Sequence, residues 1–265
     1  MKKSLLYLFV FFFVQYFSSL AVFFVWAQVK GVSIDTLRAS SAADTVPILI
    51  TSSAISSLLL IAVFIWRKWA ELSPTWLRAR RWDVLFWAGV ASLGTIVPST
   101  GLQELMPTFD DSLTETFKAI AGNDYGYFML CLFAPFVEEV VFRGSILRAL
   151  LGCVKKPWVA IAISALLFSV GHVNPAQMPH AFLISLLLGW MYYRTGSILP
   201  GVAMHWVNNT VCYMLIVLAP QYEEMSLSQV FGGPLRVALA IVCSLCILAP
   251  ALFRLNAGMR KAVRR

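Results

Sequence analysis

Two adjacent carboxylates, Glu138 and Glu139, lie in an apolar run between Tyr125 and Leu151 that also contains Arg143. An ionised side chain at mid-membrane depth costs about 2.5–3.5 kcal/mol on insertion scales, so such residues usually serve a function. Glu139 and Arg143 are four residues apart and can pair on one helix face, whereas Glu138 projects about 100° away. The pair can be a purely structural ion pair, and this spacing leaves Glu138 free for chemistry.

Further polar residues recur in later apolar segments. His172 follows Phe168 at helical spacing, and His205 and Asn209 are four residues apart, so the last two project from one helix face. Each can be explained singly as an interhelical hydrogen-bonding group. Together with a spare glutamate they predict water activation, because carboxylate and imidazole are general bases and Asn and His can donate to an oxyanion. This chemistry fits peptide-bond hydrolysis without a covalent intermediate.

The composition predicts an all-α, polytopic membrane protein. Of 265 residues, 59% are hydrophobic and 13% charged, with a mean hydropathy of +0.76. Apolar stretches near the ~20 residues that cross a bilayer predict one integral membrane domain, 1–265, of about eight transmembrane helices. The predicted spans are 4–29, 46–66, 83–102, 126–149, 157–173, 179–194, 198–219 and 234–255.

The distribution of basic residues predicts the orientation. With a cytoplasmic N-terminus, sixteen of the 21 basic residues fall in cytoplasmic segments. They are Lys2, Lys3, Arg67, Lys68, Arg78, Arg80, Arg81, Arg148, Lys155, Lys156, Arg194, Arg254, Arg260, Lys261, Arg264 and Arg265. The positive-inside rule therefore places both termini in the cytoplasm. The net charge of +8 has the same source and does not indicate nucleic-acid binding.

Other polar and amphipathic features have simpler interpretations. His180, at the start of the sixth span, has no partner at helical spacing and is expected to be structural. Cys243 and Cys246 form a CxxC without a second pair, which favours helix packing over metal binding. The loop from Gln103 to Asn123 has apolar residues at Leu113, Phe117 and Ile120, which is typical of a short interfacial helix or of a simple connector.

Three motifs resemble those of a known family. Glu138-Glu139-Val-Val-Phe-Arg143 resembles the EExxxR signature of the CPBP intramembrane proteases, the CAAX-processing and bacteriocin-processing family also called Abi. Phe168-x-x-x-His172 and His205-x-x-x-Asn209 resemble its FxxxH and HxxxN motifs, in the family's order. The matching core region is residues 125–220. The resemblance implies an eight-helix fold with an active-site cavity between spans 4, 5 and 7.

The resemblance also implies roles for the motif residues. The catalytic residues would be Glu138, Glu139, Arg143, His172, His205 and Asn209. The first glutamate would activate water with the FxxxH histidine assisting, the second glutamate and the arginine would orient the site, and the HxxxN pair would stabilise the oxyanion. The family has been described both as metal-free and as metallo-enzymes, and two histidines with a glutamate could bind zinc. A metal-free site is favoured, because using Glu138 as a ligand leaves only the paired glutamate as base.

The expected substrate is a membrane-associated or lipidated peptide or protein, cleaved in the cell membrane. A non-catalytic immunity or scaffold protein of the same fold is the alternative. A transporter would also bury such residues but typically has internal repeats, which this sequence lacks. One conflict concerns depth: at ~1.5 Å per residue, Glu138 lies about 15 Å from the cytoplasmic end, His205 about 10 Å and His172 over 20 Å. Tilt, a short fifth span, misplaced boundaries or another topology could bring them level.

Overall fold

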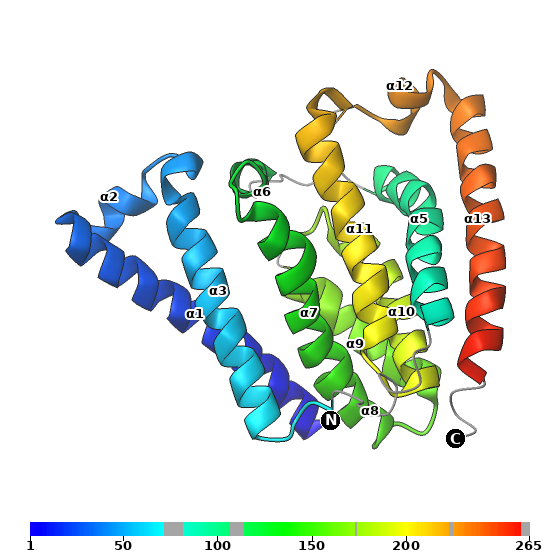
Figure 1. Cartoon of the computed structure of the whole chain (residues 1–265), viewed down its shortest axis with the longest axis horizontal. Coiled ribbons are helices and arrows are strands. Elements are labelled where there is room, and N and C mark those ends of the chain that lie inside the picture. The colour runs from blue at the N-terminus through cyan, green and yellow to red at the C-terminus, as the bar shows by residue number, and fades with distance from the viewer. Residues whose placement is uncertain (72–81, 107–113, 173, 223–224, 261–265) are drawn as a thin grey trace.

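The computed structural model describes residues 1–71, 82–106, 114–172, 174–222 and 225–260 of the chain (Figure 1). These residues form helices and turns, with no strand among them. The helices in the first half are α1 (Lys2–Lys30), α2 (Ile34–Arg38), α3 (Ala42–Trp66), α5 (Trp82–Glu104) and α6 (Thr114–Ala121). One interrupted helix follows, made of η1 (Phe128–Phe133), α7 (Ala134–Glu138), η2 (Glu139–Leu147) and α8 (Arg148–Leu151). The remainder comprises α9 (Pro157–Gly171), α10 (Met178–Thr195), α11 (Leu199–Leu218), η3 (Pro220–Tyr222), α12 (Leu227–Phe231) and α13 (Pro234–Arg260).

Five of these helices are long and apolar enough to cross a bilayer. They are α1, α3, α5, α11 and α13. Each of the other three predicted spans is also helical, but α9 has only 15 residues and η1 and η2 are π-helical. The described residues thus confirm the all-α class, with several helices capable of spanning a bilayer, and eight spans stays a prediction.

Proline and glycine residues mark several of the helix ends. Proline occupies one of the first two positions of α9, α10 and α11, where its missing N–H removes no intrahelical bond. Gly31 and Gly196 end α1 and α10 in the left-handed conformation, with φ of 67° and 63°. A side chain is disfavoured there, so glycine suits both helix ends.

Two hydrophobic cores hold the bundle together. The first lies between α1, α3, η2 and α9 and includes Phe64, Phe142 and Phe168. The second lies between α5, α10, α11 and α13 and includes Leu188 and Met204. In Figure 1, α1 and α3 stand on one side of the interrupted helix and the second group on the other. The interrupted helix, which carries the glutamates, therefore contributes to the first core and lies between the α1–α3 pair and the second group.

Charged residues separate between the two ends of the bundle. Figure 1 places both termini at one end, and α2, α6 and α12 at the other. At the termini end the described basic side chains are Lys2, Lys3, Arg67, Lys68, Arg148, Lys155, Lys156, Arg194 and Arg254, against Glu71 and Asp83. At the far end they are Lys30, Lys118 and Arg236, against Asp35, Asp44, Glu104, Glu115 and Asp124. The described residues thus repeat the asymmetry seen in the sequence.

Some sequence predictions fall outside the described residues. The short amphipathic helix predicted in this loop is present as α6, which includes Phe117 and Ile120, and its place at the membrane interface stays a prediction. Leu113 lies outside the described residues. The same holds for Arg78, Arg80, Arg81, Lys261, Arg264 and Arg265 of the predicted cytoplasmic charge set.

Candidate active site

Glu139 and Arg143 form a fully buried ion pair. Arg143 Nη1 lies 2.8 Å from Glu139 Oε1, and both residues are 0% exposed. Arg143 Nη2 donates a 2.8 Å hydrogen bond to Ser185 Oγ on α10. The guanidinium carbon lies 4.4 Å from the centre of the Phe168 ring, a cation–π arrangement. These contacts tie the interrupted helix to α9 and α10.

Glu138 has a different environment from its neighbour. Its side chain is 25% exposed and lines a cavity of about 390 Å³. It is the one acidic residue among the described residues that line this cavity. The polar lining residues are Thr100, Gln103, Glu138, His172, Gln177, His180, His205, Asn208, Asn209 and Tyr213. Four of the six predicted site residues thus line one cavity, while Glu139 and Arg143 lie behind it.

His205 lies between the two glutamates. Its Nδ1 is 3.4 Å from Glu139 Oε1 and its Nε2 is 3.6 Å from Glu138 Oε2. Since a carboxylate oxygen accepts, the contact to Glu139 favours a hydrogen on Nδ1. In the neutral ring Nε2 then carries a lone pair, and in the imidazolium form it becomes a donor toward Glu138. The buried pair thus orients the imidazole beside the accessible glutamate.

The FxxxH segment brings His172 to the same cavity. His172 Nδ1 lies 2.9 Å from the carbonyl oxygen of Phe168, which can only accept, so Nδ1 carries the hydrogen of this bond. Nε2 of the neutral ring is therefore a base. The Phe168 ring packs edge-on against both imidazoles, with centroid distances of 4.7 Å to His172 and 5.8 Å to His205.

Despite their different predicted depths, His172 and Glu138 line one cavity, because of how α9 lies against η2 and how the His172 ring is turned. Ser164 donates a 3.4 Å hydrogen bond to the carbonyl of Phe142, one helical turn beyond Glu138. α9 ends at Gly171, and the hydrogen bond back to Phe168 turns the His172 ring toward the start of its own helix. The register of α9 against η2 and the direction of the ring accordingly bring His172 to the cavity that Glu138 lines.

A hydrogen-bonded relay on the cavity wall was missed by sequence reasoning. Asn209 Nδ2 donates to the carbonyl of Leu130 (2.9 Å), and its Oδ1 accepts from Asn208 Nδ2 (3.2 Å). Asn208 Oδ1 is 3.2 Å from Nε2 of His180, whose Nδ1 is 2.8 Å from Ser99 Oγ. Because the Leu130 carbonyl can only accept, the relay has one direction, and His180 Nε2 carries a hydrogen.

The sequence favours a structural interpretation of His180, because this residue has no polar partner on its own helix. Its partners come from α5 and α11, which lie 81 and 28 residues away in the chain. The one indication of the relay in the sequence was the pair of adjacent asparagines in His205-Trp-Val-Asn-Asn209. A spacing argument along one helix cannot find such a relay.

Metal binding has no ligand set among the residues that the structure describes. No three His, Cys, Asp or Glu side chains in those ranges gather closely enough to hold an ion. Cys243 and Cys246 are exposed on α13 as free thiols. The zinc set of two histidines and one glutamate, which the sequence left open beside the favoured metal-free site, does not fit the described geometry.

The fold and cavity define a multi-pass membrane protein with a buried polar site enclosed by its helices. Residues 125–211, about a third of the chain, match the family model described as type II CAAX prenyl endopeptidase Rce1-like. The resemblance to the CPBP and CAAX proteases, predicted from three motifs, is confirmed by this match, which supports an intramembrane endopeptidase. Comparisons with curated proteins and with solved structures find no match.

Proposed function

We propose that this protein is a glutamate-dependent intramembrane endopeptidase, which hydrolyses a peptide bond in a membrane-associated or lipidated polypeptide. The observation that carries the proposal is the different environment of two consecutive glutamates. Glu138 lines the cavity beside His205, whereas Glu139 is fully buried against Arg143. One carboxylate is accessible to water and substrate, and the other is held by its ion pair.

In the proposed reaction, Glu138 removes a proton from a water molecule as the water oxygen attacks the substrate carbonyl carbon. The carbonyl π electrons move to its oxygen, which becomes the oxyanion of a tetrahedral intermediate. Collapse of the intermediate breaks the C–N bond, and the proton held by Glu138 passes to the leaving nitrogen. The products are a carboxylic acid and an amine. No covalent intermediate with the protein is required.

The histidines and Asn209 stabilise the charges that develop during this reaction. Asn209 Nδ2 uses one hydrogen on the Leu130 carbonyl and has a second for the oxyanion. A His205 that enters the reaction protonated keeps its proton throughout, so its Nε2–H is available as a donor on the Glu138 side while Nδ1 remains on Glu139. His172 assists as a second base through Nε2. Preorganised donors of this kind are each worth about 10²–10³ in rate.

The proposal extends to the whole chain. A single membrane domain, 1–265, crosses the cell membrane eight times, with both termini in the cytoplasm. Basic residues gathered at the termini end support this orientation. The region 125–220 carries the reaction, and the remaining helices enclose it.

The decisive experiment compares peptide termini in membranes from cells that produce the wild-type protein or Glu138→Gln at equal level, by mass spectrometry. Glu71→Gln is the matched control, because Glu71 forms a partly exposed pair with Arg148 far from the cavity. We expect termini that are present with wild type and Glu71→Gln and absent with Glu138→Gln. Identical termini for all three proteins would contradict the proposal and favour the non-catalytic immunity or scaffold protein.

A further inference from the structure

The candidate cavity extends toward one end of the bundle only. Gln103, the penultimate residue of α5, lines it, as do Gln177, immediately before α10, and Ile216, near the end of α11. Gln103 and Ile216 thus lie near the ends of α5 and α11 that are opposite both termini, whereas Gln177 lies closer to the middle of the bundle, because Ser169 of α9 donates to the carbonyl of the adjacent Met178 (Figure 1). The cavity therefore extends from Glu138 to the far end of the bundle.

The opposite side of the cavity is closed by packed side chains. His205 is the cavity residue of α11 closest to the termini end, and six residues, about 9 Å, separate it from Leu199 at the start of the helix. Glu139 and Arg143 are completely buried on this side, and Phe142 is 1% exposed. These residues form a floor between the cavity and the termini end.

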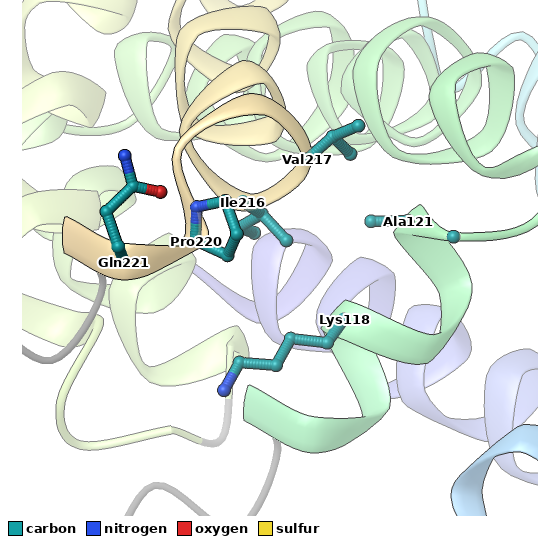
Figure 2. Close-up of a pocket in the computed structure, with 7 residues that line it drawn as sticks. Lys118, Ala121, Ile216, Val217, Pro220 and Gln221 are labelled. Atoms are coloured by element: carbon teal, nitrogen blue, oxygen red, sulfur yellow. The ribbon is translucent and has the colours of Figure 1, made fainter.

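A second cavity, of about 530 Å³, adjoins the first at the far end. Figure 2 shows it between α6, from which Lys118 extends, and the end of α11 with Pro220 and Gln221. Ile216 lines both cavities. Tyr213, which lines the inner cavity, donates a 2.9 Å hydrogen bond to the carbonyl of Ala121, which lines the outer one. Ile216 and this hydrogen bond form the partition between the two spaces.

Charge assigns the far end to one side of the membrane. The described side chains at the termini end include nine basic and two acidic residues, and those at the far end three basic and five acidic residues. Cytoplasmic segments carry the excess of Lys and Arg in multi-pass proteins, because translocating them is unfavourable. The end at which the cavities lie is accordingly the extracytoplasmic one.

We propose that the substrate reaches Glu138 from the extracytoplasmic side, by way of the outer cavity between α6, α11 and η3 and past Ile216. This inference rests on the proposed function and narrows its substrate class. The substrate is a polypeptide segment that has been exported, or is exposed at the outer membrane surface, when it is cleaved. A protein lipidated and displayed only on the cytoplasmic surface is excluded as its substrate.

The first test measures sidedness without any activity. Two variants are treated in intact cells with a membrane-impermeant maleimide: one retains Cys153 as its single cysteine, and the other carries Lys118→Cys with all five native cysteines replaced by serine. Cys153 is exposed at the termini end, so the variant that retains it reports on that side. We expect the thiol introduced at position 118 to be labelled in intact cells, and Cys153 to be labelled only after permeabilisation. The reverse pattern would overturn the proposal, whether or not the protein is a protease.

The second test blocks the proposed passage between the two cavities at Ile216. Ile216→Trp fills the junction of the two cavities, and Leu218→Trp adds the same volume at a side chain that is 71% exposed. We expect Ile216→Trp to reduce release of the Glu138-dependent termini at least tenfold, and Leu218→Trp to leave it unchanged, with both proteins equally stable in detergent. Equal release would overturn the proposed route. If Glu138→Gln also had no effect on the termini, the proposed function itself would fail, and the labelling result would stand separately.

Discussion

The carboxylate of Glu139 lies directly against the α-carbon of Gly201. A Cβ at position 201 would collide with Glu139 Oε2 and lie 3.1 Å from its carboxyl carbon. Oε2 has no hydrogen-bond partner among the described residues, and Oε1 is held by Arg143. The carboxylate therefore cannot move away without breaking the ion pair.

Gly201→Ala is expected to shift Glu139 and, with it, His205. Overpacking of this kind costs about 1–3 kcal/mol, and the altered imidazole position should lower cleavage about tenfold or more. Thermal unfolding in detergent and release of Glu138-dependent termini measure the two effects. Gly101→Ala is the control, because its Cβ would meet its nearest neighbour at an ordinary 3.5 Å. Similar behaviour of the two variants would contradict this account of Gly201.

Arg143→Met is expected to lower the stability of the protein strongly, because Arg143 is fully buried. It leaves Glu139 buried without a counter-charge, which typically costs about 3–5 kcal/mol. Glu138→Gln, by contrast, should abolish cleavage with little change in the unfolding temperature, because Glu138 is partly exposed and outside the pair. Comparison of unfolding temperature and cleavage for both variants checks this separation. A stable, inactive Arg143→Met would argue against a structural role for the pair.

His180 is predicted to position Asn209 through Asn208. His180→Gln retains an N–H that can donate to Asn208 Oδ1, whereas His180→Phe fills similar space without a donor. We expect the Phe variant to lose about tenfold or more in kcat with KM little changed, since the relay serves the oxyanion, and the Gln variant to recover much of it. Steady-state kinetics on a peptide that spans an identified cleavage site provides the measurement. Equal loss in both variants would indicate a packing role.

Phe168→Leu is expected to lower both the stability of the packed floor beneath the cavity and the rate of cleavage. The ring contacts the Arg143 guanidinium and packs edge-on against Phe142, His172 and His205. Loss of the cation–π contact alone is worth about 0.5–2 kcal/mol, and both imidazoles lose a neighbour that limits their rotation. A lower unfolding temperature together with reduced cleavage is expected. Leu166→Ala, at an exposed position of the same helix, should change neither.

The sequence was sufficient for the helical class, and helical spacing was sufficient to place His205 and Asn209 on one face of a helix. That Glu138 and His172 line the same cavity was implied only by the resemblance to the family motifs, because spacing along one helix does not relate residues of different helices. The sequence was insufficient for depth, since depth depends on where α9 begins relative to η2. The hydrogen bond from Ser164 to the Phe142 carbonyl fixes the position of α9 along η2. A local sequence pattern does not predict this contact between two helices.

The relay through His180 and the contact at Gly201 were also beyond prediction. Both depend on side chains from helices that are distant in the chain, and an isolated histidine or glycine gives no indication of its neighbours. The number of spans stays open for a related reason. Hydropathy predicts an apolar segment at 157–173, but the α9 found there has only 15 residues, fewer than the ~20 that cross a bilayer.

The closed floor beneath the cavity also has an electrical consequence. A hydrated cavity that extends from one membrane surface to His205 leaves only the packed segment around Glu139 and Arg143 as insulator. The transmembrane potential, about 2.3 kcal/mol per elementary charge at 100 mV, then falls mainly across this thin layer. The pair at its centre carries no net charge, so the layer bears the field without being driven to move. In the proposed function, water would thus reach Glu138 for hydrolysis while the packed floor keeps the membrane sealed to ions.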